Sequence, residues 1–436
     1  MINLIIKHIP GYLGASSIAG IASLVMLKYY TAIFSPEEFG VLALYLVMLQ
    51  YVMTLCSLGM NTSATRLYFD YKDTKKNEYL STIFWFISGI SILVFFSGML
   101  FIGPISNWIA PDSSIIYIVT LFAGIAATYV GFMTRVLYNE NKSKSVFKHS
   151  VFQTFVNHAT SVLLISVFNL GIFGRISGQG LGYFLNIFTL FREFYKENLF
   201  SLKIYFSKKM ATETFILAFP FMVASILAVA FAYLDRIFIN YYMGHASVGI
   251  YTLGFMLGKG LSMLYEAIYQ AILPTTYSDL KINYKKTILG LENFSFKYYI
   301  ALFVISVVIS LYSPELVDLL SNDSYAKSAE VIPFILAGFM MGGFYKIPTL
   351  ILGYHKVVWF YPFASILAFS LNAFLNWILI PSYGLIGAAF SSFIGLFLYS
   401  AIIQIMSFKY VSSRYIKIIT AAYLFIIAVG VKFFYE

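Results

Sequence analysis

The sequence predicts an all-α polytopic membrane protein with 12 transmembrane helices in two six-helix lobes related by a parallel repeat. Composition, a series of long apolar runs and the distribution of basic residues predict it. Hydrophobic residues make up 60% of the 436 residues and charged residues 11%, against roughly 25% charged in ordinary soluble domains. This composition excludes soluble enzymes, nucleic-acid-binding proteins and secreted scaffolds. One cysteine, Cys56, and five scattered histidines make a disulfide framework or a metal site unexpected.

Twelve apolar runs have the length that crosses a bilayer as a helix, about 17–25 residues. Helices are expected because every backbone N–H group needs a partner inside lipid. The runs lie near 10–33, 39–60, 81–103, 113–134, 150–170, 174–191, 214–242, 248–272, 294–312, 331–352, 358–380 and 384–407. A thirteenth run near 416–434 has Lys417 and Lys432 at its ends, and the sequence leaves open whether it inserts.

The spans divide the chain into an N-terminal six-helix lobe over 1–205, a C-terminal lobe over 206–410 and a possible extra helix over 411–436. With the N-terminus in the cytoplasm, the inner segments hold 20 Lys and Arg residues and the outer segments hold Lys327 alone. Such a bias predicts the orientation. The inner basic residues also provide contact with anionic membrane lipids. The loops are short, so we expect the function to lie inside the helix bundle.

Two pairs of short segments suggest that the second lobe repeats the first. Gly40 and Gly249 lie 209 residues apart in similar segments, and Gly171 and Gly384 lie 213 apart in another similar pair. Six spans are an even number, so the repeats would be parallel. Coincidence between short glycine-containing turns is the alternative. Two prolines inside spans, Pro220 and Pro348, should kink or interrupt their helices.

Ionisable residues inside the spans are the candidate functional residues, because charge in a bilayer is costly. The cations outnumber the acids, which predicts a cavity that attracts a phosphate or pyrophosphate group. The alternative is that each cation is paired or extends to the interface for stability. The cations are Lys28, Arg175, Arg236, Lys259 and Lys346, and the acids are Asp235 and Glu266. Polar stripes on neighbouring spans, which would line a hydrated cavity, include Asn157, Gln179, Asn372 and Asn376.

Several segments together resemble the polysaccharide or O-antigen (Wzx-type) flippases of the MATE-like (MOP) superfamily. The likeness covers essentially the whole chain, and it depends on the order and spacing of the segments. They are Ser35-Pro-Glu-Glu-Phe-Gly-Val-Leu-Ala-Leu44, Leu58-Gly-Met-Asn-Thr-Ser-Ala-Thr-Arg66, Phe219-Pro220, Leu234-Asp-Arg236, Gly249-Ile-Tyr251 and Tyr383-Gly-Leu-Ile-Gly-Ala-Ala389.

The resemblance implies a transporter, not an enzyme, in the bacterial cytoplasmic (inner) membrane. Its substrate would be an undecaprenyl-pyrophosphate-linked repeat unit of lipopolysaccharide O-antigen or another surface polysaccharide, moved from the cytoplasmic to the outer leaflet by alternating access. Lys28, Arg236, Lys259 and Lys346 would hold the pyrophosphate, with Arg175 as a further candidate, and Arg66 would recruit it at the cytoplasmic rim. A polysaccharide polymerase and glycosyltransferases are the implied partners.

Two other functions stay open. A multidrug exporter of the same superfamily would favour acidic cavity residues, whereas cations are in excess here. A glycan polymerase or glycosyltransferase would need a larger outer loop with catalytic residues, and Glu37 and Glu38 stand in a short loop without an evident partner. No cofactor is expected. Asp235 or Glu266 could couple transport to a proton or sodium gradient, and the sequence does not decide whether a gradient is used.

Overall fold

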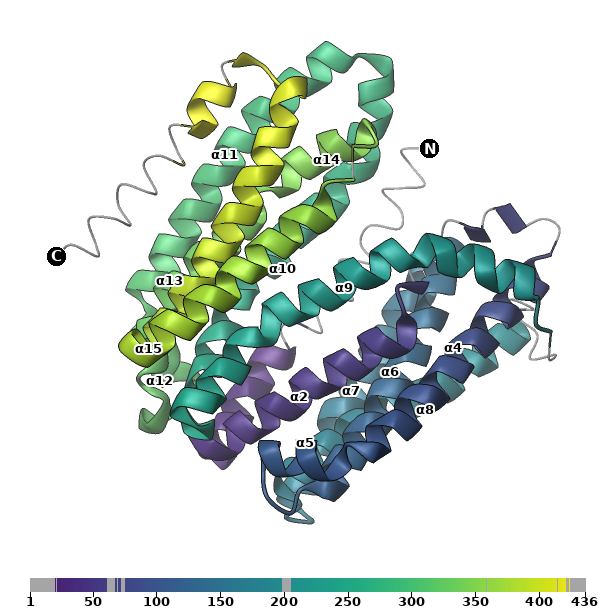
Figure 1. Cartoon of the computed structure of the whole chain (residues 1–436), viewed down its shortest axis with the longest axis vertical. Helices are drawn as coiled ribbons and strands as arrows, with labels where there is room; N and C mark the ends of the chain where they lie inside the picture. The colour runs from purple at the N-terminus through teal and green to yellow at the C-terminus, as the bar shows by residue number, and fades with distance from the viewer. Residues whose placement is uncertain are drawn as a thin grey trace. The chain divides into compact units, whose positions relative to one another are not determined.

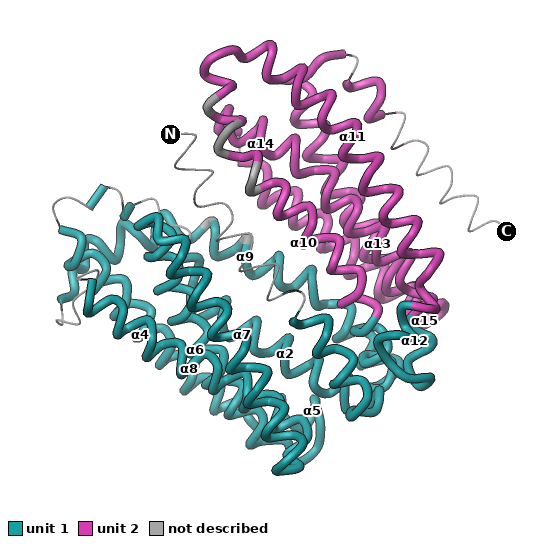
Figure 2. The backbone as a smooth tube through the Cα atoms, turned by 180° about the vertical axis from the view of Figure 1, so that it is seen from behind, with its two compact units in different colours: residues 1, 3–253, 316–328 teal, residues 2, 254–315, 329–436 magenta. Residues whose placement is uncertain are grey.

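The computed structural model describes residues 20, 22–60, 67–68, 70–71, 75–197, 205–357, 359–413, 415–420 and 423, and all structural statements below concern these residues. The chain forms two compact units (Figure 2). Unit 1 contains residues 3–253 and 316–328, and unit 2 contains 254–315 and 329–436. The boundary falls inside one long helix, α10, so each unit is described by itself.

Unit 1 is built from long helices that Figure 1 labels in chain order. A helix over residues 22–33 comes first. Helix α8 packs against α6 and α7, and α2 packs against α6 and α9. The labelled helices are α2 (Pro36–Ser57), α4 (Lys76–Leu100), α5 (Ile102–Ile109), α6 (Ser114–Asn139), α7 (Ser143–Ser166), α8 (Gly171–Lys196) and α9 (Lys208–Met243).

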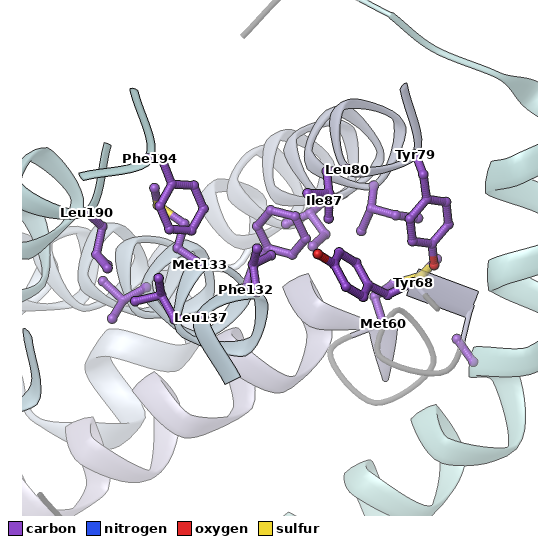
Figure 3. Packing of buried hydrophobic residues seen from close by; sticks show 14 of the residues in the cluster. Met60, Tyr68, Tyr79, Leu80, Ile87, Phe132, Met133, Leu137, Leu190 and Phe194 are labelled. Carbon is purple, nitrogen blue, oxygen red and sulfur yellow. The ribbon is translucent and has the colours of Figure 1, made fainter. Parts of the chain in front are cut away.

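The core of unit 1 lies between α4, α6, α8 and α9. Tyr79, Phe132 and Phe194 are buried there (Figure 3). Many other large apolar side chains of the unit are exposed, such as Leu93 and Phe96 of α4. An apolar surface of this kind suits helices that face lipid, because lipid tails are as apolar as the side chains.

Helix α2 begins with a complete capping box. The Ser35 hydroxyl accepts a hydrogen bond from the Glu38 N–H group at 3.2 Å, and the Glu38 carboxylate accepts one from the Ser35 N–H group at 2.9 Å. Pro36 occupies the first turn, where its missing N–H group costs nothing. The expectation that Glu38 has no partner was therefore wrong, because this carboxylate caps a helix.

The two glycines of the first repeat match, Gly40 and Gly249, lie against each other where α2 crosses the start of α10. A Cβ atom on Gly40 would lie 1.8 Å from the His245 carbonyl oxygen. One on Gly249 would lie 1.9 Å from the Pro36 carbonyl oxygen. Each glycine thus faces a carbonyl group of the other helix, and that carbonyl lies four residues before the other glycine. This reciprocal contact supports the parallel repeat.

The second pair of repeat glycines has in common a positive φ. Gly171 has φ +48° and starts α8, whereas Gly384 has φ +57° and divides α15 into two helices. A left-handed φ favours glycine because it has no Cβ atom. Both glycines therefore turn the chain where two predicted spans meet. Gly171 lies between the spans 150–170 and 174–191, and Gly384 lies between 358–380 and 384–407.

A short segment of unit 1 from later in the chain holds the end of the first helix. The Tyr325 hydroxyl donates to the Phe34 carbonyl at 2.8 Å, and the Asn322 amide donates to the Thr31 carbonyl at 2.9 Å. Thr31 in turn donates to the Leu320 carbonyl at 2.9 Å. These bonds tie the predicted outer loop near 313–330 to the end of the first span.

Unit 2 contains most of α10 and most of the helices that follow. Helices α10 and α11 continue through most of the predicted inner loop at 273–293, so these helices are longer than their apolar runs. A helical turn continues over 415–420, and most of the predicted thirteenth span lies outside the described residues. The elements of unit 2 are α10 (His245–Ile282) from residue 254 on, α11 (Tyr284–Leu311), α13 (Ser328–Phe344), α14 (Lys346–Tyr354), α15 (Tyr361–Ser407) and η2 (Phe408–Tyr410). Most of α12 (Ser313–Leu320) and all of η1 (Asp323–Tyr325) belong to unit 1.

Pro348 interrupts its span as predicted. It has no N–H group to bond the carbonyl of Phe344, and α13 ends at that residue. The Phe344 carbonyl accepts hydrogen bonds from the Tyr299 hydroxyl at 2.9 Å and the Gln404 amide at 3.0 Å. Helix α9, in contrast, is continuous from Lys208 to Met243 through Pro220.

Seven stretches of the described chain are long and apolar enough to cross a membrane. One of them, Tyr361–Tyr410, contains the two helices that meet at Gly384. Together with the helix over 22–33 and the more polar α7, α8 and α10, these stretches are consistent with 12 spans.

Candidate functional site

In unit 1, Arg175 is a buried cation with neutral partners. Its guanidinium donates to the Asn157 side-chain oxygen at 3.2 Å and lies 5.0 Å from the centre of the Tyr30 ring. Its residue is 8% exposed. Among the residues that the structure describes, no carboxylate lies within 4.0 Å of it. Its charge therefore has no acidic counter-ion in the described part of unit 1.

Close packing of α7 and α8 places Arg175 beside Asn157. A Cβ atom on Gly178 would lie 2.4 Å from the Ser161 hydroxyl oxygen, and one on Gly182 would lie 3.0 Å from the Asn157 Cα atom. Small residues thus let the two helices approach. The structure gives a clear reason for the glycines at four-residue spacing on α8.

Two other predicted residues of unit 1 are deeply buried. Arg236 donates to the Thr252 hydroxyl at 3.2 Å and to the Ala232 carbonyl at 3.1 Å, and is 3% exposed. Asp235 accepts a hydrogen bond from the Tyr251 hydroxyl at 2.6 Å and is 1% exposed. Both side chains fasten α9 to α10, and any contact of Arg236 with substrate stays a prediction.

Two lysines in predicted spans are exposed, and their ammonium groups have no ion-pair partner in the described part of the chain. They are Lys28, on the helix over 22–33 in unit 1, and Lys259, on α10 in unit 2. An ammonium group in a bilayer needs water or an anion. Arg66, the predicted rim residue, lies outside the described residues.

In unit 2, Lys346 and Glu266 form an ion pair surrounded by tyrosines. The Lys346 ammonium lies 5.6 Å from the centre of the Tyr265 ring and 5.3 Å from those of Tyr269 and Tyr345. The side chain of Lys346 is 14% exposed, and that of Glu266 is 45% exposed. We call these five residues the tyrosine cluster. The two acids and five cations of the sequence prediction thus include one direct pair.

Of the remaining predicted polar residues, Asn372 joins two helices, whereas Asn376 and Gln179 bond within their own helices. Asn372 donates to the Ser392 hydroxyl at 3.3 Å, across the two helices of α15, and Asn376 donates to Asn372 at 3.3 Å. Both asparagines are 0% exposed. Gln179 donates to the Tyr183 hydroxyl at 3.3 Å.

Sequence reasoning missed the tyrosines around Lys346. Tyr265 and Tyr269 are four residues apart, so they share a helix face beside Glu266, and this spacing was a readable signal. It also missed a buried network in which His149 lies 2.8 Å from the Glu193 carboxylate and 3.1 Å from the Asn186 side-chain oxygen. No spacing within one helix could reveal that network, since its residues come from α7 and α8.

Comparison with solved structures identifies the fold. A multidrug resistance MATE family transporter of the MOP superfamily, in an inward-facing conformation, superposes with a TM-score of 0.73 at 10% identity, covering 91% of this chain and 98% of that one. The lipid II flippase MurJ, in an inward closed conformation, superposes with a TM-score of 0.74 at 16% identity, covering 95% and 91%. At these identities the likeness shows that the chain shares the fold of these two membrane proteins, and its long apolar helices suit that fold.

Sequence comparison places the chain in a family. Residues 10–278, more than half of the chain, match the family described as polysaccharide biosynthesis protein, and the chain belongs to that family. An uncharacterized membrane protein of Haemophilus influenzae (strain ATCC 51907 / DSM 11121 / KW20 / Rd) is 22% identical over 284 residues. That match covers 64% of this chain and 66% of the relative, so the chain matches just under two thirds of the relative's length.

Proposed function

We propose that the chain is a flippase for polyprenyl-pyrophosphate-linked oligosaccharides. It moves repeat units of O-antigen or another surface polysaccharide from the cytoplasmic to the outer leaflet of the bacterial inner membrane by alternating access, with its N-terminus in the cytoplasm. A polysaccharide polymerase and glycosyltransferases are its proposed functional partners. Membership in the polysaccharide biosynthesis family supports a glycan-linked substrate.

The exposed ammonium of Lys259 is the observation that carries this proposal. Lys259 lies well inside α10, in a predicted span, and no described carboxylate neutralises it. Charge at the centre of a spanning helix costs about 2.5–3.5 kcal/mol on insertion scales. An anionic phosphate would offset that cost by pairing with the ammonium. In unit 1, Lys28 and Arg175 supply two further cations without a described acidic partner.

The acids argue against a site for cationic drugs. Asp235 is buried and accepts from Tyr251, and Glu266 pairs with Lys346. Lys346 already neutralises the charge of Glu266, and burial keeps Asp235 from an occupant of a cavity, so neither carboxylate offers the free negative charge that attracts a drug cation. The second candidate function, multidrug export, therefore has less support from the described residues.

The test is the pool of lipid-linked oligosaccharide in cells that lack the gene. We expect complete repeat units to accumulate on the inner leaflet, and the normal protein to clear them. Lys259→Ala should fail to clear them, whereas Lys259→Arg should restore part of the activity. Lys297→Ala removes another exposed lysine of unit 2 and should clear the pool normally. An unchanged pool in a strain with no second flippase would refute the proposal.

A further inference from the structure

Hydrogen bonds at a helix break support one side of the tyrosine cluster of unit 2. Tyr345 and Lys346 stand at the break between α13 and α14 that Pro348 causes. The carbonyl groups freed at this break are satisfied: Gly343 accepts from Tyr298 at 3.2 Å, and Phe344 accepts from Tyr299 at 2.9 Å. The break is therefore part of the hydrogen-bonded fold, and it presents Lys346 to Glu266 on α10.

Glycines on α13 seat one ring of the cluster. A Cβ atom on Gly342 would lie 2.7 Å from the Tyr265 hydroxyl oxygen, and one on Gly343 would lie 3.3 Å from the Tyr265 ring. Tyr265 is 6% exposed as a result. Tyr269 and Tyr345 are less buried, so they keep part of their surface for contact with another molecule.

The charges of the cluster do not suit a phosphate. Glu266 neutralises Lys346, and the more exposed member of the pair is the carboxylate, at 45% against 14%. A second anion would be repelled by this carboxylate. Hydroxyl groups, in contrast, can donate charge-assisted hydrogen bonds to it. Tyrosine rings add an apolar surface with a polar tip. A ring with many hydroxyl groups and apolar C–H faces, which is a sugar, matches both features.

Helix geometry relates the cluster to Lys259. Glu266 follows Lys259 by seven residues on α10, which is about 10.5 Å along the axis and nearly the same face. If a bound lipid placed its phosphate on the Lys259 ammonium, the groups attached to that phosphate would reach Glu266. In a glycosylated lipid these groups are the first sugars.

We propose that Glu266, Lys346, Tyr265, Tyr269 and Tyr345 form a sugar-binding site for the part of the glycan next to the pyrophosphate. This inference depends on the proposed function and deepens it. In the site, Glu266 accepts hydrogen bonds from sugar hydroxyls and Tyr269 contacts the face of a sugar ring. Lys346 positions the Glu266 carboxylate.

Binding of two defined lipids to the purified full-length protein tests the proposal. The probes are undecaprenyl pyrophosphate and the same lipid carrying one N-acetylglucosamine. The normal protein should bind the glycosylated lipid more tightly than the bare lipid. Glu266→Gln should remove about tenfold of that preference, the size of one charge-assisted hydrogen bond, and should not weaken binding of the bare lipid. Tyr269→Leu should reduce the preference because it removes the ring that contacts the sugar, and should leave binding of the bare lipid unchanged. Lys259→Ala should weaken both lipids equally.

Controls separate this site from the flippase proposal. Tyr312→Leu changes an exposed tyrosine of unit 2 away from the cluster and should keep the normal preference. Tyr269→Phe keeps the ring and should keep most of it. If Glu266→Gln and Tyr269→Leu change neither lipid, or weaken both equally, the sugar site is refuted while the flippase proposal stands. If the normal protein binds neither lipid, the proposed function itself fails, and the sugar site with it.

Discussion

The reciprocal contact of Gly40 and Gly249 predicts a specific response to alanine. Gly40→Ala places a methyl group 1.8 Å from the His245 carbonyl oxygen. A carbon atom approaches such an oxygen to about 3.3 Å, so the two helices must separate by roughly 1.5 Å. Overpacking of this kind typically costs about 1–3 kcal/mol. We expect Gly40→Ala and Gly249→Ala each to destabilise unit 1 by that amount.

The assay is unfolding of the purified protein in detergent, with Gly89→Ala as the matched control. Gly89 lies inside α4, and a Cβ atom there would meet nothing within 4 Å, so this change should be neutral or stabilise by about 0.4–1 kcal/mol. The double variant of Gly40 and Gly249 should lose less than the sum of the single variants, because one separation relieves both clashes. Equal stability of Gly40→Ala and Gly89→Ala would refute the crossing.

Three further predictions concern stability. Gly171→Ala should lower the free energy of unfolding by about 1–2 kcal/mol from its left-handed φ alone, since nothing lies within 4 Å of its Cβ position. Gly103 is another open position, and equal unfolding of Gly171→Ala and Gly103→Ala would contradict this. Gln404→Leu removes a donor to the Phe344 carbonyl and should cost about 1–3 kcal/mol in the same assay; no loss would contradict the role of this bond. Burial, and then the charge of Lys409, lower the pKa of His355 from 6.5. The unfolded chain therefore binds more protons than the folded one below pH 6.5, and the stability should fall on acidification. His355→Gln should flatten that fall, and an unchanged pH profile of stability in this variant would refute the prediction.

The sequence predicted the transmembrane architecture because its signals are local. Apolar length located the spans, and the paired glycines predicted a repeat. The structure adds that one pair lies at a helix crossing and that both glycines of the other pair have a positive φ. Helix ends were less well predicted. Helices α10 and α11 extend through most of an expected inner loop, because a helix can continue into water without an apolar run.

The site was harder to predict because its contacts join distant segments. A polar stripe shows that a helix face meets something polar, but not what that partner is. The asparagines of α15 meet Ser392 and each other, whereas the face of α10 that carries Glu266 meets Lys346, eighty residues later. Arg236 was found as a charge inside a span, yet its partner Thr252 comes from the next helix.

Transport by purified protein in sealed vesicles tests the central claim most directly. The vesicles would carry a polyprenyl-pyrophosphate-linked oligosaccharide in one leaflet, and a glycan-cleaving enzyme outside would report which leaflet holds it. We predict that the normal protein and Lys297→Ala move the lipid across and that Lys259→Ala moves it far more slowly. Equal transport by Lys259→Ala would contradict the cationic site. Transport of cationic drugs with no movement of the glycolipid would contradict the flippase function.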